Sequence, residues 1–443
     1  ITYYNSIPKE EPLIGAYIDG TYSETLPTKD SGYGVEKIVC DNNKNASWDY
    51  NKWGIKLSNW GTRSRCNIYF KSLESFKIAN KTFYLDEMQR CPTMNSDGTV
   101  PATGAEDTYG YLCKAEDAYG DSYYYRGNVT NNYVKFGNWG IKTDLVHDML
   151  NDKYYSSMED CLKNVESYFC ETISSSENNG KDMYWRIVRI NGDGTVRVIY
   201  DGTSAHTNYE SSSDRQIDTS AFNSSRNDNA YVGYMYGQTG ASTYAAAHAN
   251  TNDSTIKAYI DNWYKTNIVG TANEQYLADN LFCNDRSISS NKPSSSYNNL
   301  GYGTNATAYR WDNGTRLSSG YNFNMRLTCP QKNDAFTVSD TTNGNGALTY
   351  GVGLVTADEV VLAGGGSTNS NYYLYSGQNY WTMSPSDFSN VASVRYVSSN
   401  GNLDYESDGV GFVGVTYGVR PVLNLSSEIL KNGNGTASDP YHA

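Results

Sequence analysis

The stretch that decides the predicted fold opens with YWTMSP at Tyr380–Pro385 and closes with GVRPVL at Gly418–Leu423. Between these two ends the chain consists largely of Tyr, Asn, Asp, Ser and Gly. Rigid amphipathic tyrosines supply contact area, and small polar residues supply adaptable hydrogen bonds, as in antibody binding loops. The segment therefore indicates a surface that displays side chains and not a reaction centre.

The whole chain has 443 residues. A chain of this length is too long to fold around one ordinary hydrophobic core, which indicates two or three domains. Its formal net charge of -13 argues against a nucleic-acid partner, because contacts to phosphates need clustered Lys and Arg. The 41 tyrosines against 11 phenylalanines are typical of a β-rich protein with a hydrated exterior.

The first residues are interpreted as a linker. Residues 1–12 are short and polar, contain Pro8 and Pro12, and are expected to follow a lost signal or membrane anchor. No other stretch is long and apolar enough to span a bilayer. Contact with a membrane is therefore expected only through the missing anchor.

The eight cysteines predict disulfide bonds. None of them lies in a CxxC motif or at a spacing typical of zinc ligands, so disulfides are favoured over a metal site. Such bridges persist in an oxidising compartment, which predicts an extracellular location. Sequence does not prove connectivity, but pairing of neighbours keeps each bridge inside one module: Cys40 with Cys66, Cys91 with Cys113, Cys161 with Cys170, and Cys283 with Cys329.

One of these pairs constrains the local structure. Residues 157–169 carry apolar side chains in a helical rhythm. Nine residues of helix would separate the α-carbons of Cys161 and Cys170 by about 13 Å, whereas a disulfide tolerates at most about 7 Å. If these cysteines pair, the helix must end near Asn164.

Strand and turn patterns divide the chain into modules. Residues 13–71 contain short strands separated by turns and predict a small β-sandwich that acts as a stalk. Residues 72–120 predict an irregular connector clipped by the second disulfide. Residues 121–443 predict a large α+β head with few helices and long loops, interrupted by an inserted excursion at residues 137–181.

Two elements of the head have clear local signals. Tyr184–Ile190 and Thr195–Tyr200 flank the turn Asn191–Gly194 and predict a hairpin. Thr255–Asn267 carries an apolar stripe and predicts a helix.

Motifs for catalysis are lacking in the sequence. The chain contains no GxSxG, Walker loop or HExxH pattern, and no EF-hand loop. Asp404 and Glu406 would lie about 7 Å apart on one face of a strand, but so would the carboxylates of any acidic strand. We expect no enzyme activity, cofactor or metal, and we expect the histidines on the surface: His147, His206, His248 and His442.

Several segments carry a resemblance to known proteins. YYYRGNVTNNYV at Tyr123–Val134 and YWRIVRINGDG at Tyr184–Gly194, together with the opening and closing motifs, resemble surface proteins of Firmicutes and Mollicutes-like gut bacteria. More distantly, the aromatic opening, the strand ASVRYV at Ala392–Val397, the Asn400-Gly401 turn and the Arg-Pro closing resemble the C-type-lectin-like, formylglycine-generating-enzyme-like fold. Variable proteins of diversity-generating retroelements use that fold.

The resemblance implies a scaffold that displays side chains near its C-terminal strands for protein or glycan binding. Ordinary hydrated loops around a hairpin are the alternative, because the same residues dominate turns. The candidate ligand-binding residues lie between Ser386 and Phe412: Asp387, Phe388, Asn390, Tyr396, Asn402, Asp404, Tyr405, Asp408 and Phe412.

Two departures from the family narrow the expected chemistry. The catalytic branch needs a suitably placed cysteine pair, and no cysteine follows Cys329. Calcium-dependent lectins carry Glu-Pro-Asn or Gln-Pro-Asp with Trp-Asn-Asp, whereas this chain has the different order Trp311-Asp312-Asn313. Oxidase activity and calcium-dependent sugar binding are therefore not expected.

The predicted function is that of a non-catalytic bacterial cell-surface protein, adhesin-like, which binds a protein or glycan on a cell surface through residues 380–421. The alternative is a structural subunit of a filament or surface layer, in which the partners are copies of the chain itself. Asn-X-Ser/Thr sequons such as that at Asn128 would be glycosylated only in a suitable host, and most are expected by chance in so Asn- and Ser-rich a chain.

Overall fold

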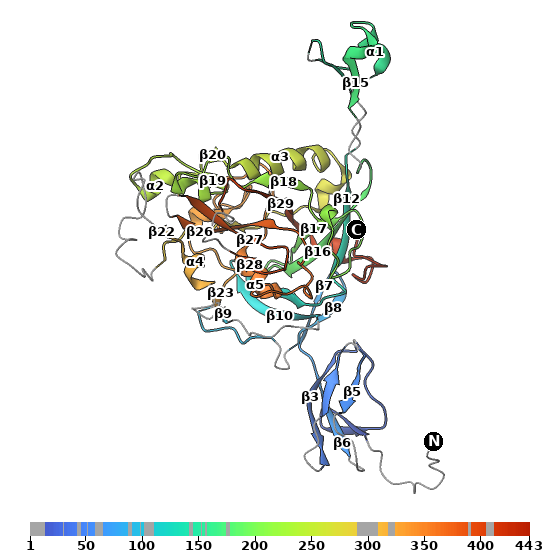
Figure 1. Cartoon of the computed structure of the whole chain (residues 1–443). Coiled ribbons are helices and arrows are strands. Elements are labelled where there is room, and N and C mark those ends of the chain that lie inside the picture. Colours follow the sequence, from blue (N-terminus) through green and yellow to red (C-terminus); the bar gives the residue numbers. More distant parts are fainter. Residues whose placement is uncertain are drawn as a thin grey trace.

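The computed structural model of the chain (Figure 1) describes residues 14–29, 31–41, 46–50, 52–57, 65–86, 91–97, 99–101, 110–140, 145–151, 153–155, 157–173, 178–289, 309–317, 324–388, 391–404 and 412–443. The protein is β-rich and has two separate main hydrophobic cores, one in an N-terminal unit and one in a much larger head. The predicted β-rich, multi-domain class is thus confirmed. The C-type-lectin-like assignment stays a prediction.

The N-terminal unit is a four-stranded sheet, in the order β2-β1-β6-β3, with a hairpin of two further strands. Alternate residues of the central strand, including Ile68 and Phe70, point into its small core, where Trp48 packs edge-on against Phe70. The strands are β1 (Ile14–Ile18), β2 (Thr21–Ser23), β3 (Tyr33–Cys40), β4 (Ala46–Asp49), β5 (Gly54–Leu57) and β6 (Cys66–Ser72).

Residues predicted to form a separate connector belong to the head. The hairpin of β7 (Ser75–Ile78) and β8 (Lys81–Tyr84) packs on the head, where the ring of Phe76 stacks on Tyr123 with centroids 3.9 Å apart. β10 (Gly110–Asp117) pairs along its whole length with β11 (Gly120–Gly127). The boundary expected at residue 121 therefore lies within a hairpin, because the buried residues of β10 need a neighbouring strand to cover them.

A seven-stranded sheet forms one layer of the head, in the order β10-β11-β16-β17-β30-β25 with β12 paired to β16. The predicted hairpin is confirmed, since β16 and β17 pair across the turn at Asn191 to Gly194. The further strands of this sheet are β12 (Tyr133–Asn138), β16 (Asp182–Ile190), β17 (Val196–Gly202), β25 (Val352–Gly353) and β30 (Val422–Leu425).

The second layer is a six-stranded sheet, in the order β18-β29-β26-β27-β28 with β22 paired to β26. Every residue of β27 is buried, and so is nearly every residue of β26, so both faces of these strands are covered. The strands are β18 (Asp218–Ala221), β22 (Tyr309–Arg310), β26 (Tyr380–Phe388), β27 (Ala392–Val397), β28 (Leu403–Asp404) and β29 (Thr416–Val419).

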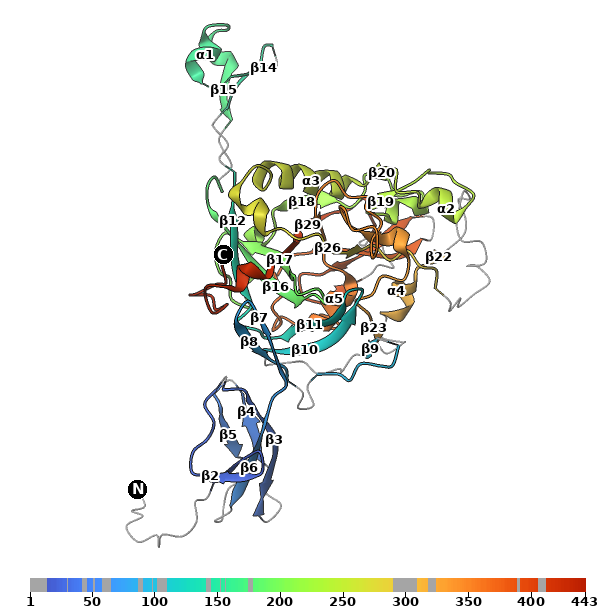
Figure 2. The same ribbon diagram turned by 180° about the vertical axis from the view of Figure 1, so that it is seen from behind.

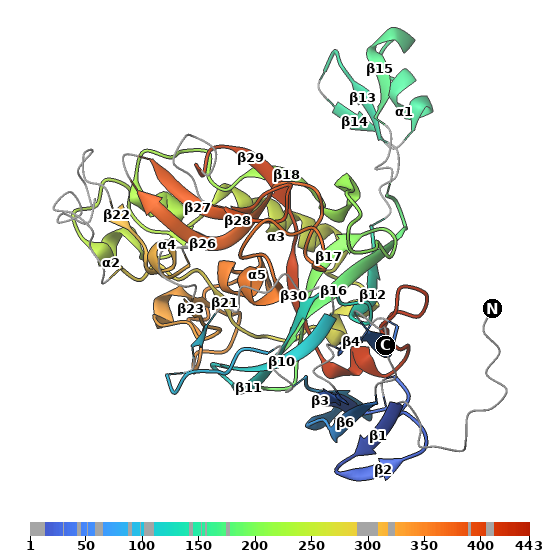
Figure 3. The same ribbon diagram turned by 60° about the horizontal axis from the view of Figure 1, so that its bottom comes forward.

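Helices fill and cover the layers of the head (Figure 3). The fully buried α5 (Ala357–Ala363) contacts β11 of the first sheet and β26, β27 and β28 of the second. The predicted helix is confirmed as α3 (Thr255–Asn267), which begins after the N-cap Ser254 and buries its apolar stripe. Shorter elements are α2 (Tyr244–Ala247), α4 (Asp312–Arg316), β9 (Val100–Pro101), β19 (Met235–Tyr236), β20 (Asn252–Asp253), β21 (Phe282–Cys283), β23 (Asn324–Met325) and β24 (Ala335–Phe336).

The inserted unit, residues 145–173, stands away from the body of the head in Figures 1 and 2. It contains β13 (Leu145–Asp148), β14 (Lys153–Tyr155), α1 (Met158–Leu162), a 3-10 turn at Ser167–Phe169, and β15 (Cys170–Ile173). Cys161 and Cys170 form a disulfide with their α-carbons 6.1 Å apart. The predicted break is confirmed, because α1 ends at Leu162.

All four predicted disulfides are present, and no cysteine is free. Such bonds are rare in the reducing cytosol, which supports a non-cytoplasmic location. Within the described ranges no helix has the length and apolarity needed to cross a bilayer.

Candidate functional site

The predicted binding residues do not all face the surface. Phe388 and Tyr396 are only 1% and 5% exposed, and the Tyr396 ring packs against Trp381 and Tyr417. Both are core residues because β26 and β27 are covered on both faces. Neither ring is available to a partner in this structure. Asn390, Tyr405 and Asp408 lie outside the described residues.

Three segments that are distant in sequence meet at the turn end of the β26–β27 hairpin. Phe388 pairs with Ala392, which places the half-buried Asp387 at this end, and Ser393 bridges to Phe412. The Ala392 amide donates to the carbonyl of Arg226 at 2.7 Å. We call Ser224–Asn227, Asp387, Phe412 and Gly414 the hairpin-end surface.

Backbone hydrogen bonds hold this surface together. The Asn223 amide donates to the Val413 carbonyl at 2.9 Å, and the Val413 amide donates to the Ala392 carbonyl at 3.1 Å. The exposed Arg226 guanidinium lies over the ring of Phe412, 5.6 Å from its centroid. The hairpin-end surface thus combines an aromatic ring, a cation and small polar residues on segments that backbone hydrogen bonds join.

The other two described candidates lie at the opposite end of β27. Asp404 pairs with Tyr396, and Asn402 belongs to a tight turn in which the Ser398 amide donates to its carbonyl at 2.9 Å. The four residue steps from Ser393 to Val397 span about 13 Å in a strand. The predicted residues therefore divide between two places and do not form one patch.

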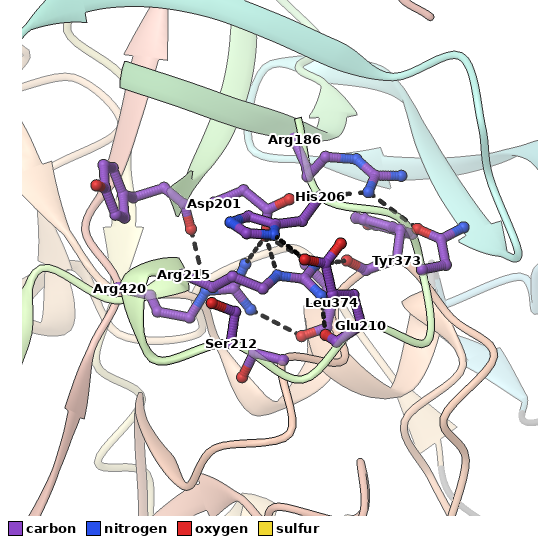
Figure 4. A network of polar contacts seen from close by, with 12 residues as sticks. Arg186, Asp201, His206, Glu210, Ser212, Arg215, Tyr373, Leu374 and Arg420 are labelled. Carbon is purple, nitrogen blue, oxygen red and sulfur yellow. Dashed lines mark hydrogen bonds and ion pairs between the residues drawn. The ribbon is translucent and has the colours of Figure 1, made fainter. Parts of the chain in front are cut away.

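Sequence reasoning missed a cluster of buried arginines around Asp201 (Figure 4). The Arg215 Nε donates to Asp201 Oδ1 at 2.8 Å, and Arg420 Nη2 donates to the same oxygen at 2.7 Å. Arg186 lies 3.8 Å from Asp201, and none of these four side chains is more than 1% exposed. Burial lowers the pKa of Arg186. The cluster ties the two strands β16 and β17 to later parts of the chain.

Backbone carbonyls accept further hydrogen bonds from these guanidinium groups. Arg420 also donates to the carbonyls of Tyr200 at 3.0 Å and Leu374 at 2.7 Å, and Arg186 donates to that of Val129 at 2.7 Å. The Arg-Pro motif that closes the predicted display segment is therefore a buried anchor.

A histidine clamp lies beside the arginine cluster. Nδ1 of His206 is 2.9 Å from the Glu210 carboxylate, and Nε2 is 2.9 Å from the Asp214 carboxylate. Burial acts to lower the pKa of His206, but the hydrogen bonds to Asp214 and Glu210 raise it above its ordinary value. The hydrogen bond with His206 lowers the pKa of Glu210. The prediction that His206 lies on the surface is wrong, because the residue is only 5% exposed. The two carboxylates supply hydrogen-bond partners for both ring nitrogens, which allows the imidazole to be buried.

The geometry of this clamp differs from that of a hydrolytic triad. The Ser212 hydroxyl donates to Asp214 and not to the imidazole. Both nitrogens of His206 face carboxylates, which favour the protonated form of the ring, and neither nitrogen is placed to accept a proton from Ser212. The arrangement fixes the 203–214 loop against β17, where a Cβ on Gly202 would lie only 2.7 Å from His206.

His248 is also buried, at 1% exposed, which again corrects the expected surface position. Its ring lies between Tyr244 and Trp311, with centroids 3.9 and 5.3 Å away. Burial and the charge of Arg286 lower the pKa of His248 to about 2, so the ring is neutral. Its role is to pack α2 against the residue that precedes α4.

A second ionic network lies at the start of α5. Glu359 accepts from Arg189 Nε at 3.0 Å and lies 2.6 Å from Arg197 Nε, and Arg189 also binds Asp117. Burial raises the pKa of Glu359, but the two guanidinium charges lower it below its ordinary value. Across the described part of the chain, no group of three or more His, Cys, Asp or Glu side chains is placed to hold a metal ion.

Comparison of the chain with known proteins finds no match among protein-family models, curated proteins or solved structures.

Proposed function

We propose that this protein is a non-catalytic extracellular binding protein, adhesin-like, whose head engages a protein or glycan on a cell surface through the hairpin-end surface. The disulfides support a location outside the cytosol. The proposal keeps the predicted C-type-lectin-like head, but it moves the contact away from the buried Phe388 and Tyr396.

The observation that carries the proposal is the Arg226 guanidinium over the Phe412 ring, next to the fully buried strand β27. Arginine and aromatic side chains dominate the binding energy of protein interfaces, particularly where a rigid scaffold presents them. Ser224, Ser225 and Asn227 flank Arg226 in the chain and are exposed, which provides polar groups next to the pair.

The test replaces Arg226 and Phe412 together by alanine and measures binding of the labelled protein to bacterial and host cells. We expect at least a tenfold loss of affinity, because two central interface residues are removed. Tyr168→Ala serves as the matched control, since that ring is 66% exposed but lies on the inserted unit. Equal binding of all three proteins would refute the proposal.

Electron micrographs of the purified protein provide a second criterion. Dispersed particles are expected for an adhesin. Regular fibres or sheets would replace this proposal by that of a structural subunit whose partners are copies of the chain.

A further inference from the structure

A cavity of about 490 Å³ lies between the N-terminal unit and the head. This volume is within the range of about 300–1,000 Å³ that is typical of small-molecule sites. The N-terminal unit contributes Tyr33, Tyr50 and Trp53 to its lining, and the head contributes Tyr84 and Tyr441 among other aromatic residues. We call this cavity the inter-unit cleft. It is separate from the hairpin-end surface, and both units are needed to form it.

Specific contacts hold the wall from the N-terminal unit. The Leu73 amide donates to the Gly32 carbonyl at 2.9 Å, and the Trp53 indole donates to the Pro27 carbonyl at 2.6 Å. Gly32 approaches the head closely, since a Cβ at this position would lie 2.6 Å from the Tyr84 ring. Its φ of +86° is also a conformation that favours glycine.

The residues of the head that line the cleft are also fixed by hydrogen bonds. The Tyr441 amide donates to the Tyr133 carbonyl at 2.9 Å and so joins the C-terminal segment to β12. Lys81 donates to the Gly433 carbonyl at 2.7 Å, and its ammonium lies 5.6 Å from the centroid of the Tyr441 ring. The aromatic residues on both sides are therefore positioned before any ligand enters.

The chemistry of the lining limits the class of ligand. Asp86 is the one charged side chain among the described residues that line the cleft, and no Lys or Arg is among them. Within the described lining, therefore, no guanidinium or ammonium group is placed to pair with an anionic ligand. Asn131, Asn434 and Thr436 add amide and hydroxyl groups between the aromatic residues, which are donors and acceptors for hydroxyl groups.

The geometry points to a site for a neutral saccharide in the inter-unit cleft. A pyranose ring has apolar C–H faces that pack on aromatic rings and a rim of hydroxyl groups that bind amides and carboxylates. Tyr84 and Trp53, which come from opposite walls, supply the aromatic contacts, and Asn131 and Asn434 supply hydrogen bonds.

The experiment titrates the full chain with lactose, cellobiose, maltotriose and chitobiose in a calorimeter. At least one of these probes is expected to bind, and Tyr84→Ala is expected to weaken that binding at least tenfold. Tyr84 is suitable because it is 38% exposed and contributes little to either core. Trp53→Phe, which retains an aromatic ring next to Trp48, is expected to weaken binding by a smaller factor.

Tyr22→Ala is the matched control, because Tyr22 is 48% exposed on the same unit as Trp53 but does not line the cleft. It is expected to bind as the unaltered protein does. Absence of binding of all four sugars, or equal binding by Tyr84→Ala, would overturn the inference. Preferential binding of choline or of a proline-rich peptide would do the same, since aromatic sites also take these ligands.

The variants also separate this inference from the proposed function. Replacement of Arg226 and Phe412 is expected to weaken binding to cells at least tenfold and to leave sugar binding unchanged. If that replacement removes sugar binding while Tyr84→Ala does not, the sugar binds at the hairpin-end surface and the assignment of the cleft is refuted.

Discussion

The head and the inserted unit are stabilised in different ways. The head buries two sheets and the α5 helix in one continuous core, and it also buries arginines that are paired with carboxylates. The inserted unit has three short strands, one turn of helix and a disulfide. It leaves five large apolar side chains at least 38% exposed: Met149, Leu150, Met158, Leu162 and Tyr168.

The difference follows from size. A segment of some 30 residues cannot bury enough apolar surface to offset its chain entropy, so a covalent bond must restrict the unfolded state. A large core can enclose charged groups, provided that each charge is paired, because their desolvation is offset within a well-packed structure. The four predictions below test this contrast, from the largest expected effect to the smallest.

Replacement of Asp201 by alanine is expected to destabilise the head most. It leaves the guanidinium groups of Arg186, Arg215 and Arg420 buried without their shared carboxylate. The expected loss is about 3–5 kcal/mol in the free energy of unfolding, measured by urea denaturation. Glu428→Ala is the control, because its pair with Lys431 is solvent-exposed and is expected to contribute at most about 0.5 kcal/mol. Similar losses in both variants would contradict the role assigned to Asp201.

Removal of the disulfide between Cys161 and Cys170 is expected to unfold the inserted unit alone. The bond closes a short loop. Its loss raises the conformational entropy of the unfolded chain, which lowers the free energy of unfolding by about 2.5 kcal/mol. In the double serine variant, hydrogen exchange of amides 145–173 should become fast while β16 and β17 stay protected. Faster exchange in β16 would mean that the two regions are not independent.

Replacement of His206 by glutamine is expected to have a moderate, pH-dependent effect. A histidine with a raised pKa stabilises the fold below its unfolded pKa near 6.5, and that contribution is lost as the pH rises through the folded pKa. Glu210 has a lowered pKa, so it stabilises the fold at pH values above its unfolded pKa near 4.5. This stabilisation is lost as the pH falls through the folded pKa.

The difference in stability between wild type and His206→Gln should therefore be greatest near pH 5–6 and shrink toward pH 9. We expect about 1 kcal/mol at the maximum, because the Glu210 and Asp214 side chains are 44% and 31% exposed and solvent weakens the pairs. Thermal melts across this pH range provide the measurement. A difference that grows with pH would refute the protonated clamp.

Replacement of Met149 and Leu150 by serine is expected to have the smallest effect. Both side chains are about half exposed, so the free energy of unfolding should change by no more than about 0.5 kcal/mol. Leu423→Ala, at a fully buried position in β30, is the contrasting variant and is expected to cost about 2–5 kcal/mol. A large loss in the serine variant would show that the exposed apolar side chains of the inserted unit are covered in solution.

Local patterns were sufficient for several elements. The Asn-Gly-Asp-Gly turn between two apolar runs identified the β16–β17 hairpin, and the apolar stripe after Ser254 identified α3. The capping box of Thr356 and Glu359 was an available signal for the start of α5. These features depend on residues that are close in sequence.

The candidate site was harder to predict because burial depends on distant segments. Strands β26 and β27 alternate apolar and polar residues, which is typical of a strand with one solvated face, but both of their faces are covered. Phe388 and Tyr396 were therefore placed on a display surface. The side chain of Arg226 completes the hairpin-end surface. Nothing in the polar loop around Arg226 indicated that this residue lies next to Phe412.

The amino-acid sequence by itself determined the β-rich class, the local hairpin and the capped helix, since turn chemistry and periodicity specify them, and it favoured the disulfide pairs that the structure shows. Only the tertiary structure decided which charges are buried and which loops meet. Arg186 and Arg189 within an apolar strand indicate buried cations, but the partner of Arg420 lies 219 residues away. The inter-unit cleft also exists only where two separately folded cores meet. Such pairings depend on how whole layers pack, and no pattern local to the chain encodes them.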